Sequence, residues 1–481
     1  MKLTQIEVEN FRCFEKITLD LHPDLTVLIA PNGGGKTSIL DALRIAVWPF
    51  VKAFDLGSQT GKSATIQTED VRRIKGDSGE MEPRVPSTVR VSGNLLSGKN
   101  DLKHWVLSRE KLTPRSNTLM DAGAKSLTNY GKTLQRRVRS FEEVTLPLMA
   151  YLGTGRLWYQ GRYHGKADEK SLNQDIFSRT WAYQNCITAS SSYKQFEDWF
   201  VWVYKSYMEH QIHTMEDEIS PEDDVRPFKE AIAVVQKAVN EITQHATGWK
   251  NLTYRTSLKQ LAMSHPDHGL MPLSFLSDGL RNTVVMVADL AFRCIRLNPY
   301  LGESAALETS GIVMIDEVDM FLHPGWQQTI IGSLQRAFPN LQFVVTTHSP
   351  QVLTTVKSES IRILKQAHST ETGSVSVSVE SPTIQSRGVA SSDILAWLMD
   401  LDPTPDVEEA RCLSAYRGLI QKGYAETPEG MKLRKTLIEH FGETHHEILE
   451  CNRLIRLADM RQTMKSKLPK AGKREAVKKG A

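Results

Sequence analysis

The stretch LTVLIAPNGGGKTSILDALRIAV, residues 25–47, decides the fold. It contains an apolar run of strand length, then a glycine-rich turn, then apolar residues at helical spacing. Strand, glycine loop, Lys-Thr and helix in this order are the context in which a phosphate-binding loop is credible. Glycines let backbone N–H groups approach phosphate oxygens, and the start of the helix adds the positive end of its dipole. The stretch therefore predicts a nucleotide site at the end of a buried strand.

The residues of this loop have separate expected tasks. Lys36 is expected to reach the β- and γ-phosphates, and the hydroxyl of Thr37 is expected to hold Mg²⁺. The first glycine of the strict motif is replaced by Ala30, which the turn tolerates if its φ is negative. The other candidates around the phosphates are Asn32, Gly33, Gly34, Gly35 and Ser38. Taken alone, the segment is also consistent with a glycine-rich turn and an incidental lysine.

Two later apolar runs end in residues suited to nucleotide chemistry. Residues 310–326, SGIVMIDEVDMFLHPGW, place Asp316 and Glu317 at the end of a buried strand. Asp316 is expected to hold the metal, and Glu317 to orient and polarise the attacking water. Residues 340–350, NLQFVVTTHSP, end similarly, and His348 is a candidate contact to the γ-phosphate. Alone, the two segments also fit an acidic turn and an ordinary surface histidine.

Residues 271–297, MPLSFLSDGLRNTVVMVADLAFRCIRL, predict a long buried helix. Ser277 or Asp278 is a good N-cap, so a capped core helix is one interpretation. The other is that Ser277, Asp278 and Gly279, with the helix dipole, address a phosphate. A second phosphate site is useful if it completes the nucleotide pocket of a partner subunit.

The order of these segments resembles the ABC-type ATPase heads of the SMC and recombination-repair group. The resemblance implies that residues 30–37 are Walker A, residues 276–280 the signature, Asp316 and Glu317 the Walker B pair, and His348 the switch histidine. It also implies ATP and Mg²⁺ as cofactors, ATP hydrolysis, and an α/β fold with a mixed sheet flanked by helices.

Further segments carry the resemblance. Residues 6–21, IEVENFRCFEKITLDL, are similar to the first strands of such heads, and DEVDMFLHPGWQQ is similar to the overcoming-lysogenization-defect (OLD) branch. The signature departs from the family pattern LSGGQ at Asp278 and Leu280. No Toprim-like acidic cluster or other nuclease signature is evident, so we expect any cleavage chemistry to belong to a partner.

A narrower resemblance is to the ATPases of Septu-type anti-phage systems, including the version that accompanies some retrons. It rests on residues 144–158, VTLPLMAYLGTGRLW, and on residues 388–420. It implies an ATPase that is partnered with an HNH nuclease, controls it and acts after phage infection; the retron form adds a reverse transcriptase and its RNA-linked DNA. From the resemblance to SMC-type heads we expect a homodimer or higher homo-oligomer through the ATPase heads. The alternative is an SMC-like, ATP-gated nucleic-acid-binding scaffold in DNA repair.

The spacing of the motifs predicts a head interrupted by an insertion. No heptad pattern is sustained, so we expect a compact helical insertion and no long coiled coil. The expected parts are an N-terminal ATPase lobe at 1–160, a helical insertion at 161–255, a C-terminal ATPase lobe at 256–385, a helical partner-binding region at 386–464 and a basic tail at 465–481.

Composition adds limits. The net charge is +3, so any nucleic-acid surface must be local, and the five cysteines form no CxxC pair. With no apolar run of spanning length, we expect a cytoplasmic protein without a membrane segment. The histidines at 440, 445 and 446 fit an exposed amphipathic helix better than a metal site. The basic tail is interpreted as a solvated disordered segment, with contact to phosphate backbones as the alternative.

Overall fold

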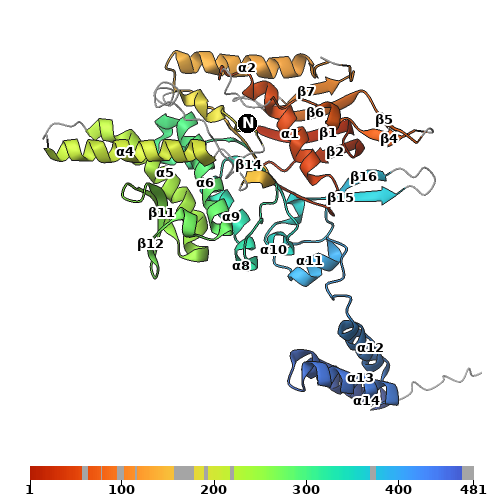
Figure 1. Cartoon of the computed structure of the whole chain (residues 1–481). Coiled ribbons are helices and arrows are strands. Elements are labelled where there is room, and N and C mark those ends of the chain that lie inside the picture. The colour runs from red at the N-terminus through yellow and green to blue at the C-terminus, as the bar shows by residue number, and fades with distance from the viewer. Residues whose placement is uncertain are drawn as a thin grey trace, which may run out of the picture. The chain divides into compact units, whose positions relative to one another are not determined.

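Figure 1 shows the computed structural model of the chain. The structure describes residues 1–56, 63–76, 79–94, 102–113, 116–156, 178–188, 193–216, 222–368 and 375–467. The chain divides into two compact units, Met1–Asp400 and Leu401–Ala481. From residue 468 onward the expected basic tail lies outside the described residues, as do residues 161–177 of the expected insertion.

A six-stranded sheet forms the centre of the first unit, in the order β16-β15-β3-β14-β13-β9. The strands are β3 (Leu25–Ile29), β9 (Leu148–Leu152), β13 (Gly311–Ile315), β14 (Leu341–Thr346), β15 (Ile361–His368) and β16 (Val375–Glu380). All neighbours are parallel except β15 and β16. Every residue of β3, β9, β13 and β14 is buried, as expected for parallel strands covered on both faces. The strands predicted at 25–29, 312–315 and before His348 are confirmed.

A second, antiparallel sheet has the order β2-β1-β6-β7-β8. Its strands are β1 (Lys2–Phe11), β2 (Phe14–Asp20), β6 (Ser87–Asn94), β7 (Leu102–Arg109) and β8 (Leu119–Met120), and β4 (Arg73–Lys75) pairs separately with β5 (Met81–Pro83). The buried side chain of Gln342 in β14 joins the two sheets, because its amide bonds both the N–H and the C=O of Leu3 at 2.7 Å. The mixed α/β architecture with flanking helices is therefore confirmed.

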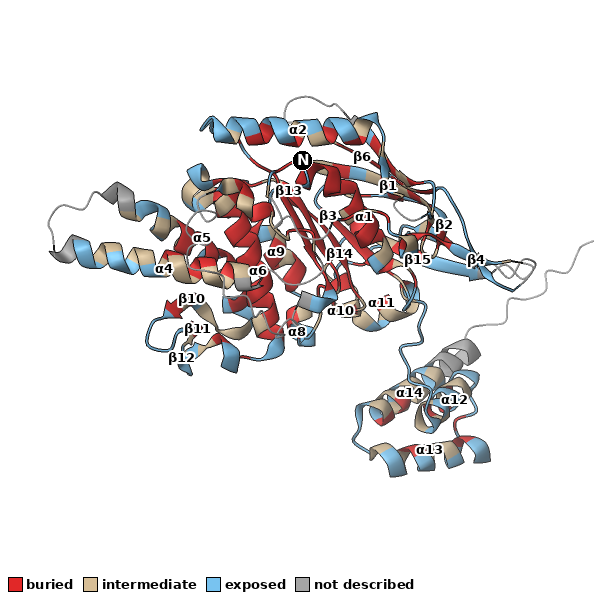
Figure 2. Ribbon diagram, turned by 45° about the horizontal axis from the view of Figure 1, so that its top comes forward, coloured by how far each residue is buried: buried red, intermediate tan, exposed pale blue. Residues whose placement is uncertain are grey.

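Helices cover both sheets. In the first unit they are α1 (Lys36–Val51), α2 (Ala122–Arg139), α4 (Tyr193–Glu216), α5 (Glu222–Thr247), α6 (Asp278–Leu297), α7 (Ala305–Glu308), α8 (Pro324–Gln327), α9 (Ile330–Ala337), α10 (Pro350–Leu353) and α11 (Ser391–Trp397). Short 3₁₀ turns lie at Thr68–Asp70, Thr154–Arg156, Arg179–Tyr183, Leu273–Phe275, Pro299–Ser304 and Ser358–Ser360. Helix α1 contacts strands of both sheets, and Figure 2 shows it buried with the central strands.

The insertion contains the helices α4 and α5, which pack side by side (Figure 1). They are followed by a three-stranded sheet of β10 (Lys250–Arg255), β11 (Gln260–His265) and β12 (Gly269–Pro272). The last residues of the region expected to be helical, 250–255, thus form a strand. Leu252 and Tyr254 alternate with more exposed neighbours and are buried, which is the pattern of a half-buried strand.

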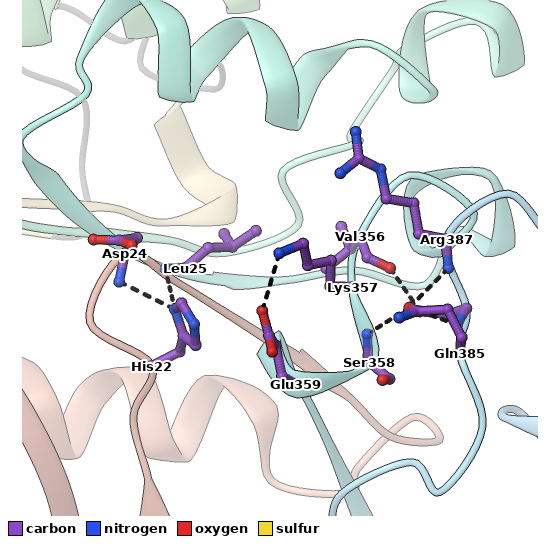
Figure 3. A network of polar contacts seen from close by, with 10 residues as sticks. His22, Asp24, Leu25, Val356, Lys357, Ser358, Glu359, Gln385 and Arg387 are labelled. Carbon is purple, nitrogen blue, oxygen red and sulfur yellow. Dashed lines mark hydrogen bonds and ion pairs between the residues drawn. The ribbon is translucent and has the colours of Figure 1, made fainter.

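The first unit extends to Asp400, beyond the expected end of the ATPase lobe at residue 385. Figure 3 shows how the segment after β16 is held: the side-chain oxygen of Gln385 accepts hydrogen bonds from the backbone N–H groups of Ser358 and Arg387, at 3.0 and 3.2 Å. Next, α11 buries Ile394, and Leu398 follows it into the same core. These apolar anchors explain why the boundary lies after α11.

The second unit consists, in its described part, of α12 (Glu408–Lys422), α13 (Pro428–Phe441) and α14 (His446–Lys467). Its own small core contains Leu413, Tyr416, Ile420, Ala425, Leu437, Ile448 and Cys451. Within the described residues of the whole chain, no group of three or more His, Cys, Asp or Glu side chains is arranged to hold a metal ion. No helix in that part of the chain is long and apolar enough to cross a membrane.

Candidate nucleotide site

The glycine loop between β3 and α1 has the backbone of a phosphate-binding turn. Gly33 and Gly35 have φ values of +76° and +94°, a region that side chains other than glycine rarely adopt. A Cβ on Gly34 would lie 2.6 Å from that of Ala30, so glycine is required there by space. Ala30 itself is not among the described residues with positive φ, which is why the turn accepts alanine at this position. Gly35 caps α1 without a side-chain hydrogen bond, which leaves the first N–H groups of the helix to an anion.

Lys36 begins α1 and folds back over the loop. Its Nζ donates to the carbonyl oxygens of Ala30 at 2.9 Å and Pro31 at 3.3 Å, and the residue is only 7% exposed. Burial lowers the pKa of Lys36, and the carboxylates of Asp316 and Glu317 oppose that shift. The ammonium group is thus held at the mouth of the loop by two carbonyls that a phosphate can replace.

Asp316 lies directly after β13 and next to the loop. Thr37 Oγ1 donates to Asp316 Oδ2 at 2.9 Å, and Thr346 Oγ1 donates to Asp316 Oδ1 at 2.6 Å. The sheet brings them together because β3, β14 and β13 are adjacent parallel strands whose carboxyl ends share one edge. A hydroxyl and a carboxylate are hard oxygen donors of the kind that Mg²⁺ takes, so Thr37 and Asp316 fit the expected metal site.

Glu317 follows Asp316 in an unusual conformation. Its φ is +49°, which is uncommon outside glycine and is found at functional sites that the surrounding structure holds in place. Its backbone N–H donates to Thr346 Oγ1 at 2.8 Å. Thr346 therefore orients both residues of the Walker B pair, and the sequence analysis missed it. The signal was its place at the end of a strand parallel to β13.

His348 lies two residues beyond Thr346, at the same edge of the sheet, and is half-buried. Between them, Thr347 Oγ1 donates to Asp319 Oδ1 at 2.5 Å, which links the segment to the loop after Glu317. The structure thus places His348 beside the segments of Lys36, Asp316 and Glu317, while its contact to a phosphate stays a prediction.

The signature segment, residues 276–280, lies at the start of α6 and not at the edge of the central sheet. Ser277 caps α6 and its side chain accepts from the N–H of Leu280, as expected for an N-cap. A Cβ on Gly279 would lie 2.2 Å from the carbonyl oxygen of Phe321, so α6 packs directly on the loop after Glu317. Ser277 and Asp278 are exposed, and none of their described contacts reaches the glycine loop of the same chain.

The turn between β1 and β2 packs against the glycine loop. A Cβ on Gly35 would lie 2.4 Å from the ring of Phe14, so the two turns touch. Arg12 lies between Asp41 of α1 and Asp70, with N···O distances of 2.7 and 2.9 Å. Burial lowers the pKa of Arg12, but the two carboxylates outweigh this and raise it. The guanidinium therefore stays charged and fixes α1 against the antiparallel sheet. This network joins three distant segments and was not anticipated from the sequence.

Comparison with known proteins agrees with this geometry. A family described as "AAA domain" matches residues 5–244, and one described as "AAA domain, putative AbiEii toxin, Type IV TA system" matches residues 154–354. The chain is 25% identical to the retron Ec83 probable ATPase of Escherichia coli, over 94% of this chain and 86% of that protein. It is 23% identical to the OLD nuclease of Thermus scotoductus, over 90% of this chain and 73% of that protein.

A shorter match, 37% identical, joins 16% of the chain to 10% of the Septu protein PtuA of Bacillus mycoides. Among solved structures, an SMC head bound to the C-winged helix domain of ScpA aligns with 79% of this chain and 98% of its own, at 11% identity and a TM-score of 0.45. The sequence relatives confirm the resemblance to the OLD group, with retron and Septu links.

Proposed function

We propose, from the premise that this chain belongs with the P-loop ATPases of the SMC and OLD group, that it is the ATP-hydrolysing subunit of a bacterial anti-phage defence complex. The observation that carries the proposal is the convergence of Lys36, Thr37, Asp316 and Glu317 at one edge of the central sheet. The defence role is supported by the retron and Septu names of the relatives. We place the protein in the cytoplasm.

Each residue at the sheet edge has a defined task in hydrolysis. Backbone N–H groups of Gly33, Gly34 and Gly35 bind phosphate oxygens, and Lys36 exchanges its two loop carbonyls for the β- and γ-phosphates. Bound Mg²⁺ would neutralise phosphate charge. Asn32 and Ser38 flank the bound phosphates.

A second group of residues would hold the metal and position the attacking water. Thr37 and Asp316 are the residues that would hold Mg²⁺. Glu317 accepts a proton from the attacking water on a carboxylate oxygen while that water attacks the γ-phosphorus and the bond to ADP breaks. His348 contacts the γ-phosphate from the end of β14.

A second chain completes the site in this proposal. Ser277 and Asp278 are exposed at the positive end of α6 and, with the backbone of the buried Gly279, bind the γ-phosphate held by the partner chain. Two chains facing each other form an isologous pair with two nucleotides between them. ATP then joins the heads and hydrolysis separates them.

This nucleotide-controlled pairing regulates a separate HNH nuclease. In a retron-type system the same complex includes a reverse transcriptase and its RNA-linked DNA. An SMC-like scaffold for DNA repair is the second candidate, since the same head suits both tasks. The two differ in turnover and in partner.

Co-expression separates the two candidates. The neighbouring genes are first searched for an HNH nuclease, the chain is purified with and without that nuclease, and phosphate release is measured with Mg²⁺-ATP. We expect a stable complex and hydrolysis that Glu317→Gln slows roughly 10²-fold or more, together with nuclease activity that differs between wild-type and Glu317→Gln complexes. A nuclease whose activity is the same in both complexes would contradict the regulatory role, and hydrolysis by Glu317→Gln at the wild-type rate would contradict the catalytic one.

A further inference from the structure

Helix α2 carries an unusual charge pattern for a surface helix. Its 18 residues, AGAKSLTNYGKTLQRRVR, include five lysines and arginines and no acidic residue. Surface helices normally mix both signs, as α13 and α14 do in this chain. The inward side of α2 packs on α1 and β7, so the charges are confined to the other side.

Three of these cations form one line. Lys125, Lys132 and Arg136 are spaced by seven and four residues, which places them on one face of the helix, and all three are exposed. Figure 2 shows exposed positions along the length of α2. From first to last they span about 16 Å at 1.5 Å per residue. Lys52 is exposed close by. We call Lys52, Lys125, Lys132 and Arg136 the basic stripe.

The basic stripe is not neutralised by the protein. Among the described residues, no carboxylate pairs with Lys52, Lys125, Lys132 or Arg136, whereas Arg137 and Arg139 pair with Glu142 and Asp55. Within the described residues, the guanidinium of Arg136 donates to the hydroxyl of Thr133, which carries no charge. The pKa of Lys52 is lowered, first by partial burial of its ammonium group and second by the nearby positive charge of Lys132. Two neighbouring cations without an anion between them favour binding of an external one.

Phe141 lies two residues after the end of α2 and places an aromatic ring in solvent. Its side chain is 97% exposed and its φ is +57°, a conformation that is rare for a bulky residue. Folding does not explain this exposure, because the ring buries almost no surface. An exposed aromatic ring beside a row of cations is the combination that single-stranded nucleic acids use: phosphates on the cations and a base stacked on the ring.

We propose that the basic stripe and Phe141 form a binding surface for single-stranded nucleic acid. The outward positions between the cations are Ser126, Asn129 and Thr133, which are polar and exposed. Protein interfaces are instead depleted in lysine and richer in apolar side chains at their centre, so an acidic protein fits less well. The inference goes beyond the proposed control of a nuclease and does not depend on ATP hydrolysis.

The test is equilibrium binding of fluorescent 20-nucleotide single-stranded DNA, single-stranded RNA and 20-base-pair duplex DNA to the full chain at several salt concentrations. The stripe variant is Lys125→Gln with Lys132→Gln and Arg136→Gln. The matched control, with the same loss of charge, is Lys422→Gln with Lys432→Gln and Lys435→Gln on exposed positions of the second unit. Phosphate release is measured for each variant as a check of folding.

We expect the stripe variant to bind single strands roughly tenfold or more weakly, with a salt slope shallower by about 2, since each lost phosphate contact contributes about 0.7. Phe141→Ala should weaken single-strand binding about tenfold, leave the salt slope unchanged and barely affect duplex binding. Equal losses in the stripe variant and the matched control would overturn the proposal. So would Phe141→Ala with unchanged single-strand affinity, or a stripe variant that loses only its protein partner.

Discussion

The two halves of the nucleotide site differ in how complete they are within one chain. At the sheet edge, Lys36, Thr37 and Asp316 have hydrogen-bond partners before any nucleotide binds. At the start of α6, Ser277 and Asp278 are exposed, and their described contacts do not reach that edge. In the function proposed above, one chain therefore supplies the residues at the sheet edge, and its signature segment acts on the nucleotide of a second chain.

The largest expected effect comes from a change at the sheet edge, which we call the prepared half of the site because its residues Lys36, Thr37 and Asp316 already have hydrogen-bond partners. Lys36→Ala removes the ammonium that the loop carbonyls hold, so we expect ATP affinity to fall by at least about a hundredfold, because no other cation of the loop can replace it. Fluorescent-nucleotide binding measures this. Tight binding by Lys36→Ala would remove the loop from its assigned role.

Next in size is the loss of the catalytic carboxylate. Glu317→Gln should slow turnover roughly 10²-fold or more, because the attacking water loses its base. ATP and Mg²⁺ affinity should stay near wild type. Asp316→Ala should differ from it by losing the Mg²⁺ dependence of nucleotide binding. Turnover of Glu317→Gln at the wild-type rate would leave the water-activating role to another residue.

Thr346 sharpens the comparison, because it belongs to the prepared half without touching nucleotide. Thr346→Val keeps the shape but removes the hydroxyl that donates to Asp316 and accepts from the N–H of Glu317. We expect about tenfold lower turnover and a higher Mg²⁺ requirement, as for the loss of a buried hydrogen-bond partner. Thr346→Ser should restore both. Turnover of Thr346→Val and Thr346→Ser is measured as a function of Mg²⁺ concentration. If the two variants show the same turnover and the same Mg²⁺ requirement, the positioning role of the Thr346 hydroxyl is refuted.

The smallest effect concerns the departure from the strict glycine motif. Since Ala30 is not among the described residues with positive φ, Ala30→Gly relieves no strain. We expect ATP affinity and turnover to change less than about threefold. A large gain on Ala30→Gly would show that alanine distorts the loop, and it would weaken the account of the prepared half.

Much of the fold followed from local sequence. The apolar runs at 25–29 and 312–315 predicted buried strands because both faces of a parallel sheet are covered. The glycine-rich segment predicted a tight turn between strand and helix, and in the structure Gly33 and Gly35 of that turn have the positive φ that glycine takes easily. These features depend on residues close together in the chain.

Other features of the fold and site depend on contacts between segments that are far apart in the chain, and local sequence patterns do not predict such contacts. Thr346 meets Asp316 and Glu317 only because β14 lies beside β13 in one particular register. Arg12 pairs with Asp41 and Asp70 across three separate segments. The extension of the first unit beyond residue 385 depends on the burial of Ile394 in α11, which the sequence of this short helix did not indicate.

The roles of His348 and of the signature residues toward a phosphate stay predictions, as does partner binding by the region after residue 385. The structure places His348 at the sheet edge and the signature residues at the start of α6, and it divides the region after residue 385 between the first unit and a separate helical unit that begins at Leu401. Their roles concern a second molecule, and sequence patterns of one chain bear on that only through resemblance.

The central claim, that two chains share each nucleotide site, is tested most directly by mixing two inactive variants. Lys36→Ala chains lack a working loop and Ser277→Arg chains lack a working signature, so each should be inactive alone. In a mixture, one interface of each mixed pair joins an intact loop to an intact signature. We therefore expect partial recovery of ATP hydrolysis, up to about a quarter of the wild-type rate if pairing is random. A mixture that stays inactive although mixed pairs are detected, for example by differently tagged chains, would contradict the claim.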